Sequence, residues 1–436
     1  MGITKGNAGE WSEPYVLLKL LADGKIYKSD KDLNINENVW HEIRSIIFKK
    51  NKSDMDGSLK YIIDPDQRTV EVQVDGEPVL RIQREDCRSY AEGLREAILT
   101  SSHGRGTVDI PATYEEYLKN SLKREVLKAS VKDTPDIWLN LEDTRNTTDK
   151  PLGFSIKSIL SSPPTIFNPS DGTNIIYELT GNVNEQTISE LQSITKHYKG
   201  VEKRGKKKVE VEYDHPNREE RVLYIRNHGI GLKLVGTGTV HHDNHGNHTL
   251  EPSQFERNLL MIGSDALPIL SFMTIEAYFN GIVNLSHLVD VLDKEDPLNY
   301  KPSPEQPFYR RRVEDMLVAM TLSMTGVDVW DGSEGTNGGM IFVKTDGDVV
   351  CYHLFDRNDF REFLLQNMRF DWPSARRYFS TSITKDGDRY LMNLNVQIRM
   401  VPRQKAMSNL LIEGYYDFEK GIVYEEHEII KMFESL

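Results

Sequence analysis

The amino-acid sequence predicts a protein of the α+β class (mixed α/β), in which strands of mixed direction are flanked by helices. Strand-like runs occur in the first and last thirds of the chain, and longer helical patterns lie between them. These elements do not alternate with the regular spacing of βαβ units, which argues against a parallel α/β fold. The chain has 436 residues, more than one ordinary core of roughly 100–200 residues needs. We therefore expect more than one part.

The N-terminal elements follow from capping residues, apolar periodicity and turn residues. A first helix is expected from Ser12-Glu13-Pro14, where Ser12 would cap it and Pro14 would occupy its first turn, to a stop at Asp23-Gly24. Strands are expected over 61–82, on either side of the hairpin signal Asp75-Gly76. The further expected elements are helices at 90–99, 114–127 and 185–194, and strands at 136–141, 153–160 and 174–180.

The composition changes at about residue 198. The stretch that follows holds the basic run 203–208 (KRGKKK) and the histidine-rich run 241–248, and we interpret it as a variable insertion or loop. Beyond it we expect helices at 255–292, 309–324 and 360–368, strands around the hairpin signal Asp346-Gly347, and a strand at 390–400. The expected parts are therefore 1–198, 199–250 and 251–436, the last of which is a further α+β half.

Asp136 and Lys157 are predicted to meet on one face of an antiparallel hairpin. They lie equally far from the middle of the polar turn between their strands, so we expect them to oppose each other directly. Ser155 shares the face of Lys157 because strand side chains alternate, whereas Phe154 and Ile156 would point to the core. A shift of one residue in register would move these side chains to the opposite face.

Pro135-Asp136 followed by Ser155-Ile156-Lys157 resembles the Pro-Asp…(Asp/Glu)-x-Lys signature of the nuclease superfamily that includes most restriction enzymes. The resemblance implies a restriction-endonuclease-like PD-(D/E)xK core with a central mixed sheet. It implies that Asp136 binds Mg²⁺, a cation that prefers hard oxygen ligands. It also implies that Lys157 acts on the attacking water or on the phosphate.

Ser155 departs from this signature, because the superfamily has Asp or Glu at that position. Serine is a poor ligand for Mg²⁺, so the second carboxylate would come from Glu13 or Glu10 on the first helix, or from Glu178 on the strand that follows. Alternatively, a single carboxylate would act together with water and phosphate oxygens. The candidate catalytic residues are Asp136, Lys157, Ser155 and Glu13.

Several longer blocks, in the same order along the chain, resemble restriction endonucleases of the HpaII type. They include KGNAGEWSEPY (5–15), LGFSIKS (152–158), PPTIFN (163–168), TNIIYE (173–178), KTDGDVVCYH (344–353), residues 360–364, Pro373-Ser374 with Arg377, and NLNVQIR (393–399). The resemblance implies Mg²⁺-dependent cleavage of double-stranded DNA at CCGG, with a cognate DNA methyltransferase as functional partner. A palindrome of this kind is most simply read by a homodimer, or is cut by successive nicks in single strands.

Reading guanine in the major groove calls for arginine or lysine side chains. Arg377 is our first candidate because it lies in a stretch that resembles the family, and Arg376, Arg399 and Gln397 are the others. Two alternatives remain open at this point. The same nuclease could act on another site, or the chain could be a DNA-binding module that has lost cleavage, as Ser155 would permit.

Composition narrows the class without choosing between a nuclease and a metabolic enzyme. The formal net charge of −13 argues against a uniformly basic nucleic-acid binder, although a local basic cleft would suffice for a nuclease. No run of 18 or more apolar residues occurs, so we expect no membrane span. The two cysteines and the absence of a signal-like N-terminus favour a cytoplasmic protein.

Overall fold

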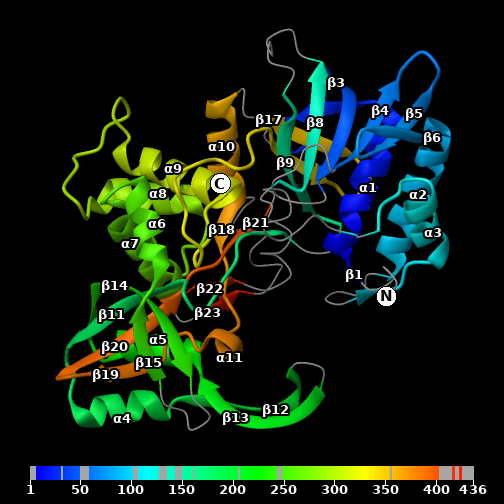
Figure 1. Cartoon of the computed structure of the whole chain (residues 1–436). Helices are drawn as coiled ribbons and strands as arrows, with labels where there is room; N and C mark the ends of the chain where they lie inside the picture. The colour runs from blue at the N-terminus through cyan, green and yellow to red at the C-terminus, as the bar shows by residue number, and fades with distance from the viewer. Residues whose placement is uncertain are drawn as a thin grey trace. The chain divides into compact units, whose positions relative to one another are not determined.

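The computed structural model divides the chain into two compact units (Figure 1). Unit 1 comprises Met1–Pro164 and Glu334–Phe363, and unit 2 comprises Thr165–Ser333 and Leu364–Leu436. The residues that the structure describes are 6–30, 33–49, 58–101, 107–125, 127, 135–142, 150–160, 163–204, 207–242, 248–353, 356–401, 415–417 and 422–424. The units do not coincide with the expected parts, because strands from the last third of the chain complete the sheet of unit 1.

Unit 1 contains a mixed sheet whose described strands follow the order β2-β17-β16-β9-β8-β3-β4-β5-β6. β2 pairs with both β17 and β3, so the strands from β2 to β3 in this order close into a ring. The pairs β16–β9 and β17–β2 are parallel, whereas β8–β9 and β3–β8 are antiparallel. The strands are β2 (Lys25–Ser29), β3 (Ile35–Lys49), β4 (Ser58–Asp64), β5 (Thr69–Val74), β6 (Glu77–Gln83), β8 (Ile137–Glu142), β9 (Leu152–Ser158), β16 (Gly339–Val343) and β17 (Val349–His353). The expected α+β class and the mixed sheet are confirmed.

Both hairpin signals of unit 1 are confirmed. Asp75 and Gly76 join β5 to β6 with φ angles of 54° and 86°, the left-handed pair that a tight hairpin turn requires. Gly347 lies in the turn between β16 and β17 with a φ of 96°, a conformation that side-chain-bearing residues rarely adopt. These turns depend on local sequence alone, which is why the sequence predicts them.

Helix α1 (Ala8–Asp23) begins earlier than expected. Asn7 caps the helix, and Glu10 completes a capping box by accepting a hydrogen bond from the Asn7 backbone N–H at 3.0 Å. The expectation that Ser12 caps the helix is therefore wrong. Ser12 lies inside the helix and donates to the Ala8 carbonyl at 2.7 Å, and Pro14 also lies within the helix. The spacing of Asn7 and Glu10 is that of a capping box, whereas Ser12 has Tyr15 and no Glu or Gln three residues later.

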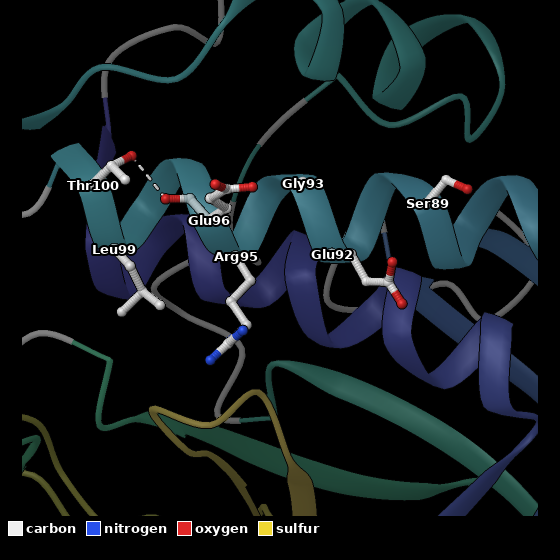
Figure 2. A pocket seen from close by; sticks show the side chains of 7 residues that line it. All are labelled: Ser89, Glu92, Gly93, Arg95, Glu96, Leu99 and Thr100. Carbon is white, nitrogen blue, oxygen red and sulfur yellow. Dashed lines mark hydrogen bonds between the residues drawn. The ribbon is translucent and has the colours of Figure 1, made fainter.

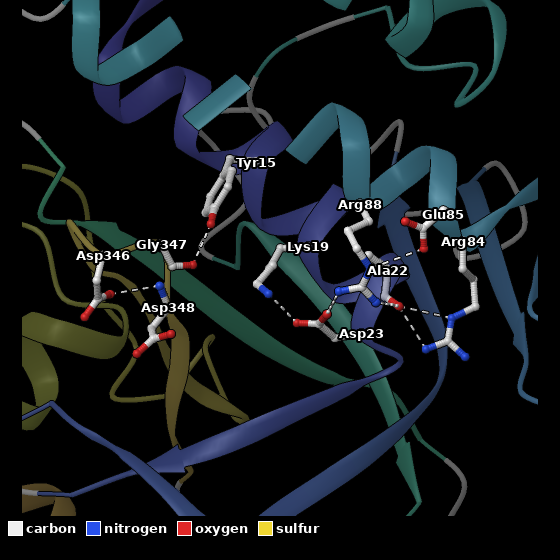
Figure 3. Close-up of polar contacts among 10 residues, drawn as sticks. All are labelled: Tyr15, Lys19, Ala22, Asp23, Arg84, Glu85, Arg88, Asp346, Gly347 and Asp348. Atoms are coloured by element: carbon white, nitrogen blue, oxygen red, sulfur yellow. Dashed lines mark hydrogen bonds and ion pairs between the residues drawn. The ribbon is translucent and has the colours of Figure 1, made fainter. Parts of the chain in front are cut away.

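The side chains of α1 are buried around almost its whole circumference. The helix contacts β2, β9 and β17 of the sheet, and it packs against α2 (Arg84–Ser101). The other described elements of this region of unit 1 are α3 (Ala112–Asn120) and the short strand pair β1 (Gly6–Asn7) and β7 (Thr107–Val108). Figure 3 shows polar contacts of α1. In the middle of the helix, the Tyr15 hydroxyl donates to the Gly347 carbonyl at 2.5 Å, and at its C-terminal end, Arg84 and Arg88 both donate to the Ala22 carbonyl. Asp23 forms ion pairs with Lys19 at 2.8 Å and with Arg88 at 3.1 Å. These contacts tie α1 to α2 and to the β16–β17 hairpin.

Unit 2 is built on a sheet with the order β15-β14-β11-β20-β19, beside a smaller sheet β10-β21-β18 and the two-stranded ribbon β12–β13. The strands are β10 (Thr165–Phe167), β11 (Asn174–Gly181), β12 (Thr195–Arg204), β13 (Lys207–Pro216), β14 (Ile230–His242), β15 (His248–Pro252), β18 (Met368–Phe370), β19 (Ile383–Asp386), β20 (Arg389–Asn395), β21 (Ile398–Met400), β22 (Tyr415–Asp417) and β23 (Ile422–Tyr424). The helices are α4 (Glu185–Ser193), α5 (Arg218–Asn227), α6 (Gln254–Ile262), α7 (Ala266–Asn280), α8 (Leu285–Glu295), α9 (Phe308–Leu322) and α11 (Ala375–Tyr378), and α10 (Arg357–Asn367) begins in unit 1 and ends in unit 2.

The interpretation of 199–250 as a loop is wrong for the residues that the structure describes. They form β12, β13, α5, β14 and β15, and β14 pairs with β11 in the main sheet of unit 2. In β13, Val209, Val211 and Tyr213 alternate with acidic residues, which is a strand pattern. This alternation predicts a strand although a basic run precedes it and a histidine-rich run follows it in the sequence.

Two other boundaries differ from the expected ones. The helix expected over 114–127 ends at Asn120, and Lys123 just beyond it has a left-handed backbone with a φ of 55°. The strand expected over 390–400 is interrupted between β20 and β21. Within the described ranges, no one helix has both the length and the apolar composition to cross a membrane; α6 and α7 meet that test only as a pair, which is bent by 111°.

We expect Tyr15→Phe to lower the free energy of unfolding by about 1–3 kcal/mol, because it leaves the buried Gly347 carbonyl without its donor. Chemical denaturation followed by tryptophan fluorescence would measure the change. Tyr90→Phe is the matched control, because the Tyr90 ring stacks on Tyr117 and no hydrogen bond of its hydroxyl to another described residue is found. Equal stability of the two variants would contradict the assigned role of the Tyr15 hydroxyl.

Candidate active site

The register of β8 and β9 places Asp136 opposite Ser155. Ile137 pairs with Phe154, and the Asp136 backbone N–H donates to the Phe154 carbonyl at 2.9 Å. The expected direct opposition of Asp136 and Lys157 is therefore wrong by two residues. Because the shift is an even number of residues, Asp136, Ser155 and Lys157 still lie on one face, as expected. Phe154 and Ile156 belong to the hydrophobic core of unit 1.

The carboxylate of Asp136 is held in a fixed orientation just before the start of β8. Its Oδ2 accepts hydrogen bonds from the Ile156 backbone N–H at 2.6 Å and from the Ser155 hydroxyl at 3.2 Å. Ser155 is only 5% exposed, so its hydroxyl serves the carboxylate and does not reach solvent. No hydrogen bond of Oδ1 to another described residue is found, which leaves this oxygen for an external ligand.

Lys157 lies two residues beyond Ser155 on β9 and is partly exposed. It is level with Phe342 of the parallel neighbour β16. Among the described residues, its ammonium group forms no ion pair or hydrogen bond. A lysine in this state has its charge available for an anion such as phosphate.

Glu13 on α1 is held by a buried arginine that the sequence did not predict. The Arg124 guanidinium donates to Glu13 Oε2 at 3.1 Å and to the Leu127 carbonyl, and it lies over the Phe48 ring at 4.2 Å. The exposed fractions of the Arg124 and Glu13 side chains are 2% and 12%. The sequence does not indicate that Arg124 is buried, because its charged neighbours Lys123 and Glu125 are typical of an exposed segment.

Arg124 also links Glu13 electrostatically to Asp136. Burial lowers the pKa of Arg124, while its electrostatic interactions with Glu13, Tyr61 and Asp136 oppose that shift. Helix α1 meets β9 directly through a hydrogen bond of 2.7 Å from the Ser12 hydroxyl to the Ser158 hydroxyl. Unit 1 thus gathers four candidate residues, Asp136, Ser155, Lys157 and Glu13, on β9, the start of β8 and the adjoining helix.

The other two candidate ligands lie elsewhere. Glu10 completes the capping box of α1. Glu178 lies on β11 in the main sheet of unit 2, 3.5 Å from Lys233, and its strand is not in the same sheet as the strand of Lys157. In the part of the chain that the structure describes, no group of three or more His, Cys, Asp or Glu side chains could hold a metal ion. Asp136 and Glu13 supply hard oxygens that suit Mg²⁺, which commonly completes its shell with water and phosphate oxygens.

The four candidate DNA-reading residues lie in unit 2 and differ in accessibility. Arg377 is exposed on the short helix α11, and the neighbouring Arg376 lies over the Tyr198 ring at 4.1 Å. Arg399 forms an ion pair with Asp371 at 2.7 Å, and Gln397 is only 5% exposed. Of these four residues, the two on α11 are therefore the most accessible to DNA.

An open hollow of about 690 Å³ runs along α2 (Figure 2), and its lining residues lie between Ser89 and Thr100. Arg95 extends from the helix there and donates to the Thr345 carbonyl at 2.6 Å. None of the candidate catalytic residues lines this hollow. We therefore assign this hollow no role in the chemistry of Asp136 and Lys157, although it is large.

The chain matches the family model described as HpaII restriction endonuclease over residues 7–215 and 244–400. It is also similar to the type II restriction enzyme HpaII of Haemophilus parainfluenzae, with 28% identity over 400 residues that cover 91% of this chain and 98% of that protein. No solved structure gives a significant match. The matched stretches include every candidate residue named above, and also Arg124.

We expect Arg124→Met to lower the free energy of unfolding by about 3–5 kcal/mol, because it leaves the Glu13 carboxylate buried beside an apolar side chain. Combining it with Glu13→Gln should restore part of the loss, and a double-mutant cycle by chemical denaturation would measure the coupling. The control is Arg44→Met, which breaks an exposed pair with Glu142 and should cost less than about 1 kcal/mol. Strictly additive effects of the two buried substitutions would show that the pair is not coupled.

Proposed function

This chain belongs to the HpaII restriction endonuclease family, and on that premise we propose that it cuts both strands of double-stranded DNA at CCGG with Mg²⁺. Membership makes it a type II restriction endonuclease, a site-specific deoxyribonuclease. The observation that carries the chemical part of the proposal is the anchored Asp136 carboxylate, with Lys157 on the same face. The proposed core is that of the PD-(D/E)xK superfamily, which the Asp136 and Lys157 arrangement supports.

The residues of this site have distinct proposed roles in hydrolysis. Asp136, through Oδ1, and Glu13 would hold Mg²⁺, which lowers the pKa of bound water and neutralises charge on the phosphate. The Lys157 ammonium would orient the attacking water, and its charge would stabilise the extra negative charge as water adds to phosphorus. The P–O bond to the leaving oxygen breaks, and the proton lost by the water passes through solvent to that oxygen. Ser155 and the Ile156 N–H keep Asp136 in place. Ser155 is thus a positioning residue in this proposal and not a metal ligand, while Glu10 and Glu178 are reserve candidates.

A palindromic target fits a two-fold arrangement, so the proposed active form is a homodimer that brings one site to each strand. The proposed DNA readers are Arg377 first, then Arg376, with Arg399 and Gln397 as further candidates. The functional partner of such an enzyme is a DNA methyltransferase that protects the host sites, and the proposed location is the cytoplasm. A DNA-binding role without cleavage is an outcome of the experiment that follows.

We expect the purified protein to cut plasmid DNA with Mg²⁺ and to leave it intact in excess EDTA. Asp136→Asn keeps the shape and one acceptor oxygen of the side chain but loses its charge, so cleavage should be abolished in a folded protein. Lys157→Met should slow single-turnover cleavage by several decades, or ~3–5 kcal/mol in barrier at ~1.4 kcal/mol per decade. Lys150→Met, at an exposed lysine before the same strand, is the control.

Metal-independent cleavage would refute the proposed metal site. Wild-type rates in the Asp136 or Lys157 variant, with matched circular dichroism spectra, would remove that residue from the mechanism. If the wild type binds DNA but does not cleave it with any divalent cation, the alternative that the chain is a DNA-binding module without cleavage activity is supported.

We expect the ends of the plasmid fragments to fall within CCGG. Arg377→Ala should reduce discrimination against single altered base pairs by ~1–3 kcal/mol, the scale of one bidentate base contact. Competition between duplexes would measure this, with Arg389→Ala, an exposed arginine paired with Asp386, as control. Equal weakening on all duplexes would make Arg377 a backbone contact, and cleavage at another palindrome would replace CCGG as the target.

A further inference from the structure

A second hollow lies in unit 2, at the base of the β12–β13 ribbon, where Thr195 pairs with Pro216. It has a volume of about 470 Å³, and residues of α4, β12, β13, α5, β19 and the turn after α11 line it. Small-molecule sites in proteins commonly have volumes of roughly 300–1,000 Å³. The roles proposed above use none of these lining residues.

A buried cation lines this hollow. Arg221 of α5 is 4% exposed, and its guanidinium donates to the carbonyls of Gln192, Ile194 and Thr381 at 2.7–2.8 Å. A guanidinium has five N–H donors, so these three bonds leave two donors. Among the residues that the structure describes, no carboxylate pairs with Arg221. Burial lowers the pKa of Arg221 to about 10, so the side chain stays charged at neutral pH. An unpaired buried charge costs free energy, and a ligand with acceptor atoms would remove part of that cost.

Two further side chains give the hollow a hydrogen-bonding group and an aromatic wall. Ser382 is 2% exposed, and its hydroxyl forms no hydrogen bond with another described residue. Phe379 also lines the hollow, and its ring stacks on Tyr213 of β13 at 6.1 Å, which helps to fix the ring in place. These groups suit a flat heterocycle with acceptor atoms at its edge. An inorganic anion such as phosphate would make no use of the aromatic wall.

The turn that carries Phe379 and Ser382 has a strained backbone. Phe379 and Thr381 have left-handed φ angles of 47° and 70°, and a β-branched residue such as threonine rarely adopts this conformation. Two hydrogen bonds hold Thr381 there: its carbonyl accepts from Arg221 at 2.7 Å, and its N–H donates to the Asn393 carbonyl at 2.8 Å. Strained backbone costs free energy and is concentrated at active sites and ligand-binding sites. The backbone therefore supports a ligand site at this turn independently of the side chains.

The hollow directly follows the proposed DNA reader along the chain. Phe379 is two residues beyond Arg377, which is exposed on α11. DNA contacted by Arg377 would therefore bring its bases near the hollow. A base that is stacked within a duplex cannot enter a pocket, whereas an extruded base can, at the cost of its stacking and pairing energy.

We propose that this hollow takes up a cytosine base extruded from the DNA duplex at the recognition site. This inference rests on the proposed function. The two remaining donors of Arg221 would meet O2 and N3 of the cytosine, the Ser382 hydroxyl would bond to the same edge, and Phe379 would contact the flat face of the base. Cytosine is favoured over guanine because the smaller ring stacks less strongly in the duplex and costs less to extrude.

The test places the fluorescent cytosine analogue pyrrolocytosine at each cytosine in turn, in a duplex with one copy of the site that the wild type cuts. Ca²⁺ replaces Mg²⁺ to prevent cleavage. We expect the emission from one position to rise on binding, because an extruded base leaves the stack that quenches it. Ser382→Ala should reduce this rise and weaken binding roughly 5-fold, the scale of one hydrogen bond. Phe379→Leu removes the aromatic face and should weaken binding by a similar factor or more.

Stability separates a binding role of Ser382 from a structural one. Ser382→Ala removes a buried hydroxyl that has no hydrogen bond to a described residue, so the unfolding midpoint should stay equal or rise. Ser264→Ala, at an exposed serine of unit 2 outside the hollow, is the control and should change neither emission nor affinity. A lower midpoint of Ser382→Ala with unchanged emission would give the hydroxyl a structural role and overturn the inference.

Calorimetric titration with cytidine monophosphate in the absence of DNA tests the other source of such a base. Binding that Ser382→Ala weakens, together with constant emission from the duplex, would assign the hollow to a free nucleotide and overturn extrusion. A wild type that binds and cuts DNA with constant emission at every cytosine would overturn the extrusion alone. A wild type that neither binds nor cuts any duplex would overturn the proposed function, and this inference with it.

Discussion

The near-complete burial of helix α1 is the constraint on which the rest of unit 1 depends. A helix enclosed on all sides must have each of its polar side chains satisfied inside the protein, because an unpaired buried group costs free energy. Ser12 therefore bonds to Ser158 of β9, Glu13 to Arg124, and Tyr15 to the turn of the β16–β17 hairpin. These contacts place β9 and the hairpin around the helix, and β9 in turn holds the carboxylate of Asp136.

Sequence patterns predicted the features that depend on neighbours along the chain. The Asp75-Gly76 and Asp346-Gly347 turns and the shared face of Asp136, Ser155 and Lys157 follow from turn chemistry and from the alternation of strand side chains. Alternation fixes the face but not the register, since a shift of two residues preserves every face. The pairing of β9 with β16 was not readable, because it joins residues far apart in sequence. The same distance hid the contact of Arg124 with Glu13.

The serine at position 155 has a physical explanation in the geometry of Asp136. An acidic side chain at that position would set a second negative charge against Oδ2, whereas the serine hydroxyl donates a hydrogen bond to it. A carboxylate that accepts two bonds on one oxygen is oriented before any ligand arrives. The second negative charge of the region comes from α1, where Arg124 balances it. The acidic side chains therefore lie on separate elements, Asp136 before β8 and Glu13 on α1, and a motif of a few consecutive residues cannot contain both.

Unit 1 is discontinuous, because the chain leaves it at Pro164 and returns at Glu334. During synthesis β9 emerges early, whereas its parallel neighbour β16 is made only after most of unit 2. At typical elongation rates the interval is roughly 10–40 s. Until then one edge of β9 lacks its partner strand and the ring is open between β9 and β2. A ribosome that stalls within unit 2, or a gene truncated there, yields a chain in which the sheet of unit 1 is incomplete. The order of synthesis thus delays the completion of this sheet until β16 and β17, at Gly339–His353, have been made.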